Sequence, residues 1–222
     1  MRRPSRQEQK ALTQFRKDCE KALRQVVKGT GWKKCGPIVF REVDGILISA
    51  AFIPLLDRPS LAYLWAKPMN LDPIFWDILQ MPENLKQPLS FRTRAAIMAG
   101  NLEIEQGEVD GAPEPIKTCQ NFIAWAESRL PSALATLKEK PFSVLVADES
   151  NRIWPARWET LVTAYIAEDN LPAARRLIDE RKGQGLFPEG LESLNFLLAD
   201  TKNFFTLADK WLRRRLIDNE PA

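Results

Sequence analysis

The stretch PIVFREVDGILISAAF, residues 37–52, predicts a β-hairpin, and the rest of the fold can be worked out from it. Two apolar runs rich in valine and isoleucine, residues 37–43 and 46–52, flank Asp44-Gly45, a dipeptide typical of a two-residue hairpin turn. Residues 61–66 have a similar character and are followed by Lys67-Pro68, so we expect a third strand there. The N-terminal half of the chain therefore contains an antiparallel sheet.

One amphipathic helix is expected before this hairpin, from Ser5 to Lys28. Its apolar residues recur every three or four positions and so share one face: Leu12, Phe15, Cys19, Leu23 and Val26. Two further strands are expected after the hairpin, because residues 91–94 and 101–105 alternate between apolar and polar side chains. Since a lone helix cannot bury its apolar face, we predict an α+β fold in which the long N-terminal helix packs on an antiparallel sheet of about five strands.

The second half of the chain, after a loop at residues 111–115, is expected to be mostly helical. Apolar periodicity predicts helices over residues 116–130, 131–138, 156–168, 171–182 and 191–217, while residues 141–146 fit either a sixth strand or a helical link. The helix pair at 156–182 resembles one tetratricopeptide-like hairpin, and no second copy follows at a fixed period. We expect two domains, 1–112 and 113–222, packed as one compact unit.

The 222 residues include no histidine. Histidine is the commonest general base and metal ligand near neutral pH, and neither a glycine-rich phosphate loop nor a nucleophile elbow takes its place. This excludes Ser-His and Cys-His catalytic arrangements, and we expect a non-enzymatic protein with no catalytic residues, no cofactor and no metal. The three cysteines lie far apart, which suits a reducing cytoplasm, and we expect no membrane span because the chain has no long apolar run.

The densest carboxylate cluster is the first candidate binding site and consists of Glu103, Glu105, Glu108 and Asp110. On a strand, Glu103 and Glu105 point to the same face. There they could pair with basic groups of a protein partner, hold the cation of a metal-dependent hydrolase, or simply form a solvated edge. Trp76 and Trp154 lie near prolines and loops, so we expect them to be exposed anchors for a protein partner.

Positive charge is concentrated at the N-terminus, which makes this region the second candidate surface. Residues 1–34 contain 11 basic and 3 acidic side chains, whereas the remainder of the chain carries a net charge of −5. An anionic partner would be nucleic acid, contacted by Arg16, Lys17, Lys21, Arg24, Lys33 and Lys34. The same charges also fit the solvated face of an amphipathic helix.

The long helix is followed by Gly31-Trp32-Lys33-Lys34, then by Val39-Phe40-Arg41-Glu42, then by a second strand. In this respect residues 8–105 resemble a family of small bacterial α+β domains of unknown function. Some members of that family look like immunity proteins of polymorphic-toxin systems, which bind and neutralise a cognate toxin. The resemblance implies no catalytic residues. Our first hypothesis is therefore a cytoplasmic protein-interaction protein, an immunity protein that occludes a toxin, and the alternative is a nucleic-acid-associated protein.

Overall fold

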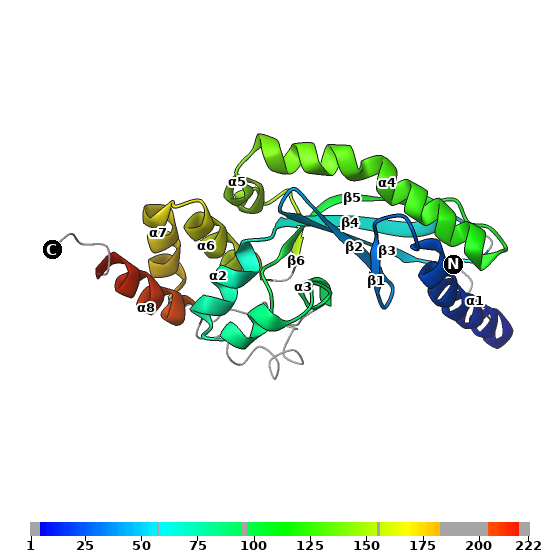
Figure 1. The fold of residues 1–222 in the computed structure, drawn as a ribbon, viewed down its shortest axis with the longest axis horizontal. Helices are drawn as coiled ribbons and strands as arrows, with labels where there is room; N and C mark the ends of the chain where they lie inside the picture. The colour runs from blue at the N-terminus through cyan, green and yellow to red at the C-terminus, as the bar shows by residue number, and fades with distance from the viewer. Residues whose placement is uncertain (1–4, 57, 95–96, 155, 183–203, 218–222) are drawn as a thin grey trace. The chain divides into compact units, whose positions relative to one another are not determined.

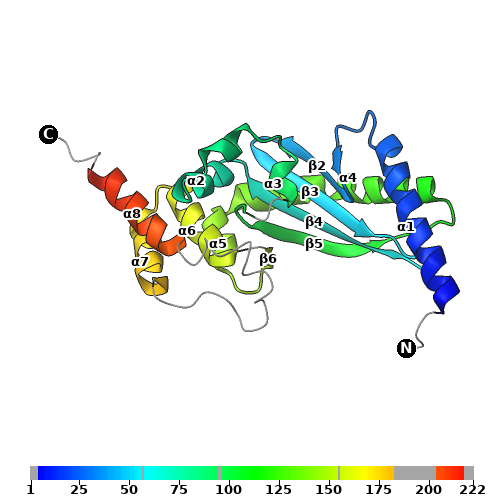
Figure 2. The same ribbon diagram turned by 90° about the horizontal axis from the view of Figure 1, so that it is seen from below.

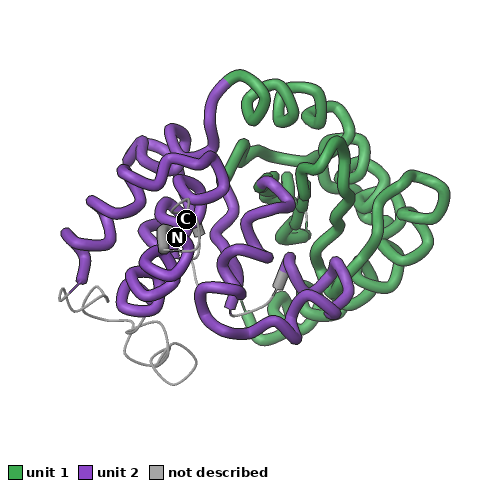
Figure 3. The backbone as a smooth tube through the Cα atoms, turned by 60° about the vertical axis from the view of Figure 1, so that its left-hand side comes forward, with its two compact units in different colours: residues 1–67, 103–139 green, residues 68–102, 140–222 purple. Residues whose placement is uncertain are grey.

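The computed structural model describes residues 5–56, 58–94, 97–154, 156–182 and 204–217. One sheet in these residues has the strand order β1-β2-β3-β4-β5-β6, and helices dominate the chain after β5, which confirms the predicted α+β fold (Figure 1). The chain forms two compact units, unit 1 (residues 1–67 and 103–139) and unit 2 (residues 68–102 and 140–222), coloured in Figure 3. Each unit combines two stretches of chain, whereas the predicted domains, 1–112 and 113–222, are each continuous. The division into domains 1–112 and 113–222 stays a prediction.

The N-terminal helix α1 (Arg6–Val26) confirms the predicted amphipathic helix. Its start is fixed by a capping box, in which the Ser5 hydroxyl accepts from the Glu8 backbone N–H and the Glu8 carboxylate accepts from the Ser5 N–H. Its buried residues are those that the periodicity placed on one face or their direct neighbours: Phe15, Cys19, Ala22 and Leu23. The helix ends at Val26 with Val27 as its C-cap, and two residues later Gly29, with φ of 80°, takes a backbone conformation that side chains disfavour.

The predicted hairpin consists of β2 (Ile38–Val43) and β3 (Ile46–Ile53) in antiparallel register. Asp44 and Gly45 have φ of 53° and 74°, the positive values that a two-residue turn of this hand requires. Strand β1 (Lys33–Cys35) pairs with β2 and was not predicted, because three residues are too short for a periodic signal. Strands β4 (Ser60–Pro68) and β5 (Asn101–Val109) confirm the strands expected at 61–66 and 101–105.

The core of unit 1 lies where α1 and α4 (Pro115–Glu139) pack on the sheet. Phe122 is fully buried at its centre, and its ring stacks on Phe52 with centroids 4.3 Å apart. The break expected before residue 131 is wrong, since α4 continues through Pro131 as one helix. Proline removes one hydrogen bond from a helix interior, and here the buried side chains of Leu130 and Ala133 on either side keep both halves on the same core.

Unit 2 is mainly helical. It contains α2 (Leu71–Ile78), the 3₁₀ turn η1 (Pro82–Lys86), α3 (Phe91–Arg94), α5 (Phe142–Ala147), α6 (Arg157–Ala167), α7 (Leu171–Arg181) and α8 (Phe204–Ile217). The two-residue strand β6 (Ile153–Trp154) pairs with the first two residues of β5, Asn101 and Leu102, which also belong to this unit. The predicted helical hairpin is confirmed as α6 and α7. Of the helix predicted at 191–217, residues 204–217 form α8 and residues 191–203 lie outside the described part of the chain.

Two predictions concern local structure in unit 2. The strand predicted at residues 91–94 is wrong, and residues 141–146, for which a strand and a helix were both expected, are settled by the structure. Residues 91–94 form a short helix and not a strand: the N–H groups of residues 91–93 each donate to the carbonyl three positions earlier, and the Phe91 ring lies 5.9 Å from that of Trp76. Residues 141–146 belong to a helix, α5, and not to a sixth strand. The Glu168 carboxylate accepts from the backbone N–H and the hydroxyl of Ser143, which satisfies the first turn of α5.

Candidate functional site

The motif on which the family resemblance rests forms an internal contact in unit 1. The Trp32 indole N–H donates to Oε1 of Glu127 on α4 at 2.8 Å, and the Arg41 guanidinium binds the same carboxylate at 3.1 Å. Arg41 also lies over the Trp32 ring, 5.7 Å from its centroid. Gly31 has φ of 80° and its Cα lies beside that guanidinium. The glycine, tryptophan and arginine of the motif therefore join the hairpin to α4.

Removal of the Glu127 carboxylate is expected to destabilise unit 1. Glu127→Ala leaves a buried indole N–H and a partly buried guanidinium without their acceptor, which costs roughly 1–2 kcal/mol of unfolding free energy. Glu127→Gln keeps an acceptor for Trp32 and is expected to cost less than the alanine change. Urea unfolding of the three proteins measures the difference, and equal stability of all three would contradict this role.

The carboxylate cluster lies on β5 and the loop after it, and the fold uses part of it. Glu105 accepts from the Arg129 guanidinium at 2.7 Å, and that guanidinium also stacks over a ring of the unit 1 core, 4.6 Å from the centroid of Trp125. Glu103 is partly buried and also has an interaction partner. Glu108 and Asp110 are exposed. Among the described residues, no group of three or more cysteine, aspartate or glutamate side chains could hold a metal ion.

The expectation that Trp76 is an exposed anchor is wrong. Its side chain is 0% exposed, its indole N–H donates to the Ile97 carbonyl at 2.9 Å, and the Arg92 guanidinium lies over its ring. A tryptophan in a short helix before a proline-rich turn has the same sequence signature whether its ring points inwards or outwards, so the sequence could not decide this point. The side chain of Trp154 lies outside the described part of the structure.

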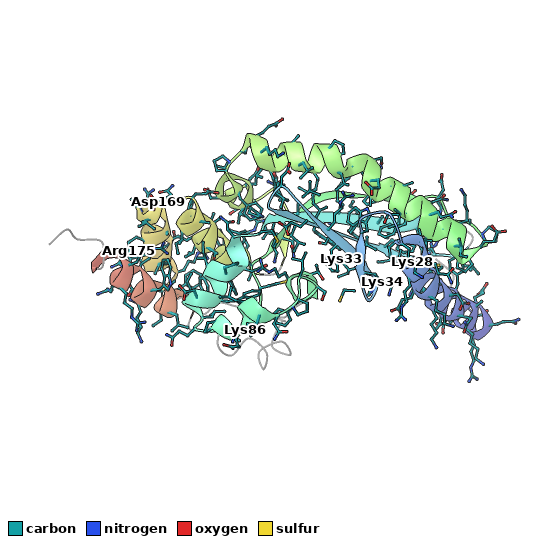
Figure 4. The ribbon with its side chains drawn as sticks, in the orientation of Figure 1. Lys28, Lys33, Lys34, Lys86, Asp169 and Arg175 are labelled. Carbon is teal, nitrogen blue, oxygen red and sulfur yellow. The ribbon has the colours of Figure 1, made fainter. Side chains whose placement is uncertain are left out.

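Two of the six predicted nucleic-acid contacts are engaged inside unit 1. Arg16 donates from Nε to the Pro54 carbonyl at 3.1 Å. Lys34 pairs with Glu20 at 3.5 Å, and only 9% of its side chain is exposed. Lys17, Lys21, Arg24 and Lys33 are exposed as expected. Figure 4 labels Lys33 and Lys34 on β1, beside Lys28 at the end of α1.

The exposed cations of α1 form one line along the helix. At 100° per residue, Arg6, Lys10, Lys17, Lys21 and Arg24 fall within roughly 60° of each other around the axis, and Lys28 continues the line in the turn after the helix. We call these six residues the basic stripe. All six are exposed, and the buried residues Phe15 and Cys19 lie on the opposite face. The signal was present in the sequence as spacings of three, four and seven. The predicted contacts nevertheless included Arg16, which is off the line, and omitted Arg6, Lys10 and Lys28.

The first turns of α1 have little contact with the rest of unit 1. Residues 6–11 are all exposed, and Figures 1 and 2 show the N-terminal part of the helix extending away from the sheet and from α4. Among the described residues, the one acidic side chain that forms an ion pair with the stripe is Asp18, which lies 3.6 Å from Lys21. Such a pair of surface side chains, with that of Lys21 77% exposed, contributes little stability and is easily exchanged for another anion.

Comparison with known proteins adds no family to these observations: no protein-family model, curated protein or solved structure matches the chain. The resemblance to small bacterial domains therefore stays a hypothesis from the sequence. In the described residues, no helix combines the length and the apolar character needed to cross a membrane.

Proposed function

We propose that this protein is a non-enzymatic, cytoplasmic binding protein and that the basic stripe of α1 associates with the phosphate backbone of nucleic acid. One observation supports the proposal above the others: five exposed cations share one side of a helix whose opposite side is buried in the core, and Lys28 continues their line in the turn that follows. A merely solvated helix face needs charge but does not need charge of one sign on one line. The proposed cytoplasmic location agrees with three free cysteines.

The length of the stripe suits a regular polyanion. From Arg6 to Arg24 the helix rises about 27 Å at 1.5 Å per residue, and Lys28 extends the stripe beyond it. A nucleic acid backbone presents phosphates at short, even intervals over such a distance, and each phosphate neutralised by lysine or arginine releases a bound counterion. Backbone contacts carry no sequence information directly, so we expect binding that is independent of base sequence.

Charge reversal on the stripe is the test. Lys10→Glu, Lys17→Glu and Lys21→Glu together are expected to weaken binding of a labelled duplex of about 20 base pairs by at least 100-fold at low salt, because half of the stripe then repels phosphate. Fluorescence anisotropy measures the affinity, and circular dichroism confirms that α1 remains helical.

The matched control removes the same charge elsewhere. Lys86, Lys140 and Arg176 are exposed side chains outside the stripe, and Lys86 is labelled in Figure 4. Reversal of these three is expected to change the affinity only a few-fold. If both triple variants lose binding equally, net charge and not the stripe is responsible, and the proposal fails.

A protein partner is the second candidate, and it includes the immunity hypothesis. Glu108 and Asp110 favour it, since they are exposed and form no ion pair with any cation in the described ranges of the chain. Two observations weaken the hypothesis of a protein partner: Trp76 is buried and cannot serve as an anchor, and Glu105 pairs with Arg129 within the fold. The same titration ranks the two candidates: an absence of nucleic-acid binding at low salt puts the protein partner first.

A further inference from the structure

A groove in unit 2 lies between α2 and α8 and has a volume of about 310 Å³. Its apolar lining includes Ile78 of α2 and Leu207 and Trp211 of α8. Pockets that bind small molecules start at about this volume and combine an apolar lining with a few placed polar groups. None of these residues takes part in the basic stripe, so the groove is independent of the function proposed above.

The Trp211 ring is held in a defined orientation. Its indole N–H donates to Oδ2 of Asp77 on α2 at 2.6 Å. The Arg215 guanidinium lies 4.9 Å from the centroid of the same ring and does not line the groove. A hydrogen bond at the edge and a cation over the ring fix the indole as a flat, rigid wall, which is the kind of surface on which another ring stacks.

Two cations stand at the groove with no carboxylate partner. Lys210 and Arg214 line it, both are exposed, and they are one turn apart on the same side of α8. Neither forms an ion pair within the residues that the structure describes. The neighbouring Arg213, by contrast, binds Asp209 on the side of α8 that faces α7. One carboxylate, Asp77, also lines the groove, where it accepts from the Trp211 indole N–H. The two cations outnumber it, so the net charge of the groove favours an anion beside the indole.

The wall of the groove also contains a strained residue. Gln80 follows the end of α2 with φ of 59°, a conformation usually taken by glycine at this position, and the Met81 N–H returns to the Trp76 carbonyl at 2.8 Å. A side chain other than glycine in this region costs of order 1 kcal/mol or more, and such residues cluster at binding sites. Gln80 is one of the residues that line the groove.

We propose that the groove binds a small aromatic anion, a flat ring that carries one carboxylate or phosphate. The ring stacks on Trp211 against Pro82 and Leu207, and the anionic group pairs with Lys210 and Arg214. Asp77 stays on the indole N–H and does not contact the anion. Carboxylates and phosphates share this recognition chemistry, so the probes include both.

The test follows the indole N–H of Trp211 in a nitrogen–proton correlation spectrum of the full chain, with the signal assigned through Trp211→Phe. Naphthoate and naphthyl phosphate are titrated in parallel with naphthylmethanol, which has the ring but no charge. We expect a saturable shift of the Trp211 signal with one or both anions and about tenfold weaker binding of the alcohol. The stronger of the two anions identifies the source of the charge.

Variants of the cations complete the test. Lys210→Gln with Arg214→Gln keeps the apolar lining and is expected to weaken binding of the anion about tenfold, while Lys86→Gln with Arg176→Gln leaves it unchanged. The proposal is overturned if no anion shifts the Trp211 signal, if the alcohol binds as well as the anions, or if the two pairs of variants behave alike. None of these outcomes depends on nucleic-acid binding by α1.

Discussion

Replacement of Phe122 by alanine is expected to lower the unfolding free energy by about 3–5 kcal/mol, the usual range for a buried aromatic ring. Phe122 has no exposed surface and stacks between Phe52 and Trp125, at centroid distances of 4.3 and 6.4 Å. Phe122 joins α4 to β3 in the centre of the unit 1 core. Because no flexible surface side chain among the described residues is close enough to fill the space, Phe122→Ala leaves a cavity there. Urea unfolding followed by far-ultraviolet circular dichroism measures the loss.

Ile116 offers a control on the same helix. Its side chain is 48% exposed in the first turn of α4, and Ile116→Ala is expected to change the unfolding free energy by less than about 0.5 kcal/mol. If Phe122→Ala were as mild as this control, α4 would not pack on the sheet in the way described. A complete loss of folding would still agree with the account, and Phe122→Leu then gives the graded measurement.

Asp209 is expected to make the stability of unit 2 depend on pH. This carboxylate of α8 is 6% exposed and binds Arg175, Lys182 and Arg213. Hydrogen bonds from Lys182 and Arg213 lower the pKa of Asp209 from 3.8 to about 2. Because the pKa is lower in the folded protein, the ion pairs stabilise it fully above the unfolded value and lose their effect as the pH falls towards 2.

The difference between wild type and Asp209→Asn measures this contribution. The pKa values correspond to roughly 2 kcal/mol near neutral pH and about half of that at pH 3, so the two stabilities are expected to converge as the pH falls. Asp179→Asn is the control, since Asp179 is 58% exposed and forms an ion pair with Arg175 at 3.4 Å. A difference that is constant between neutral pH and pH 3 would contradict the assignment.

The parts of the fold that local chemistry dictates were predictable. Asp44-Gly45 requires the positive φ values that the structure shows, and Ser5 with Glu8 forms the capping box that starts α1. The α6–α7 pair was equally clear, because Asn170 caps α7 and Pro172 lies in its first turn. In each case a few neighbouring residues carry the whole signal.

Elements that depend on tertiary contacts were not predictable. Phe91 to Arg94 alternates like a strand, yet its helical turn is held by the ring of Trp76 and by an Arg92 hydrogen bond to the Met69 carbonyl. The strands β1 and β6 are two or three residues long and exist only through their partners. Pro131 looks like a helix start, but the core holds α4 together through it.

In the candidate site, too, features set by local helix geometry were predictable and features set by tertiary contacts were not. The spacing of lysines and arginines in residues 6–28 contains the basic stripe, because the stripe depends only on helix geometry, but the predicted contacts included only Lys17, Lys21 and Arg24 of its six residues. The sequence could not predict which of these side chains form contacts within the fold. Arg16 donates to the Pro54 carbonyl and Lys34 pairs with Glu20, and both partners are distant in sequence. The Trp211 groove likewise needs α2 and α8, which are separated by more than a hundred residues.

The salt dependence of nucleic-acid binding decides whether the basic stripe contacts a phosphate backbone. If the six cations of the basic stripe contact phosphates, the logarithm of the association constant falls linearly with the logarithm of the salt concentration, with a slope of about −5. Reversal of Lys10, Lys17 and Lys21 is expected to make that slope shallower by about 3. A wild-type slope near zero, or a slope that the stripe variant leaves unchanged, would show that α1 does not bind a phosphate backbone.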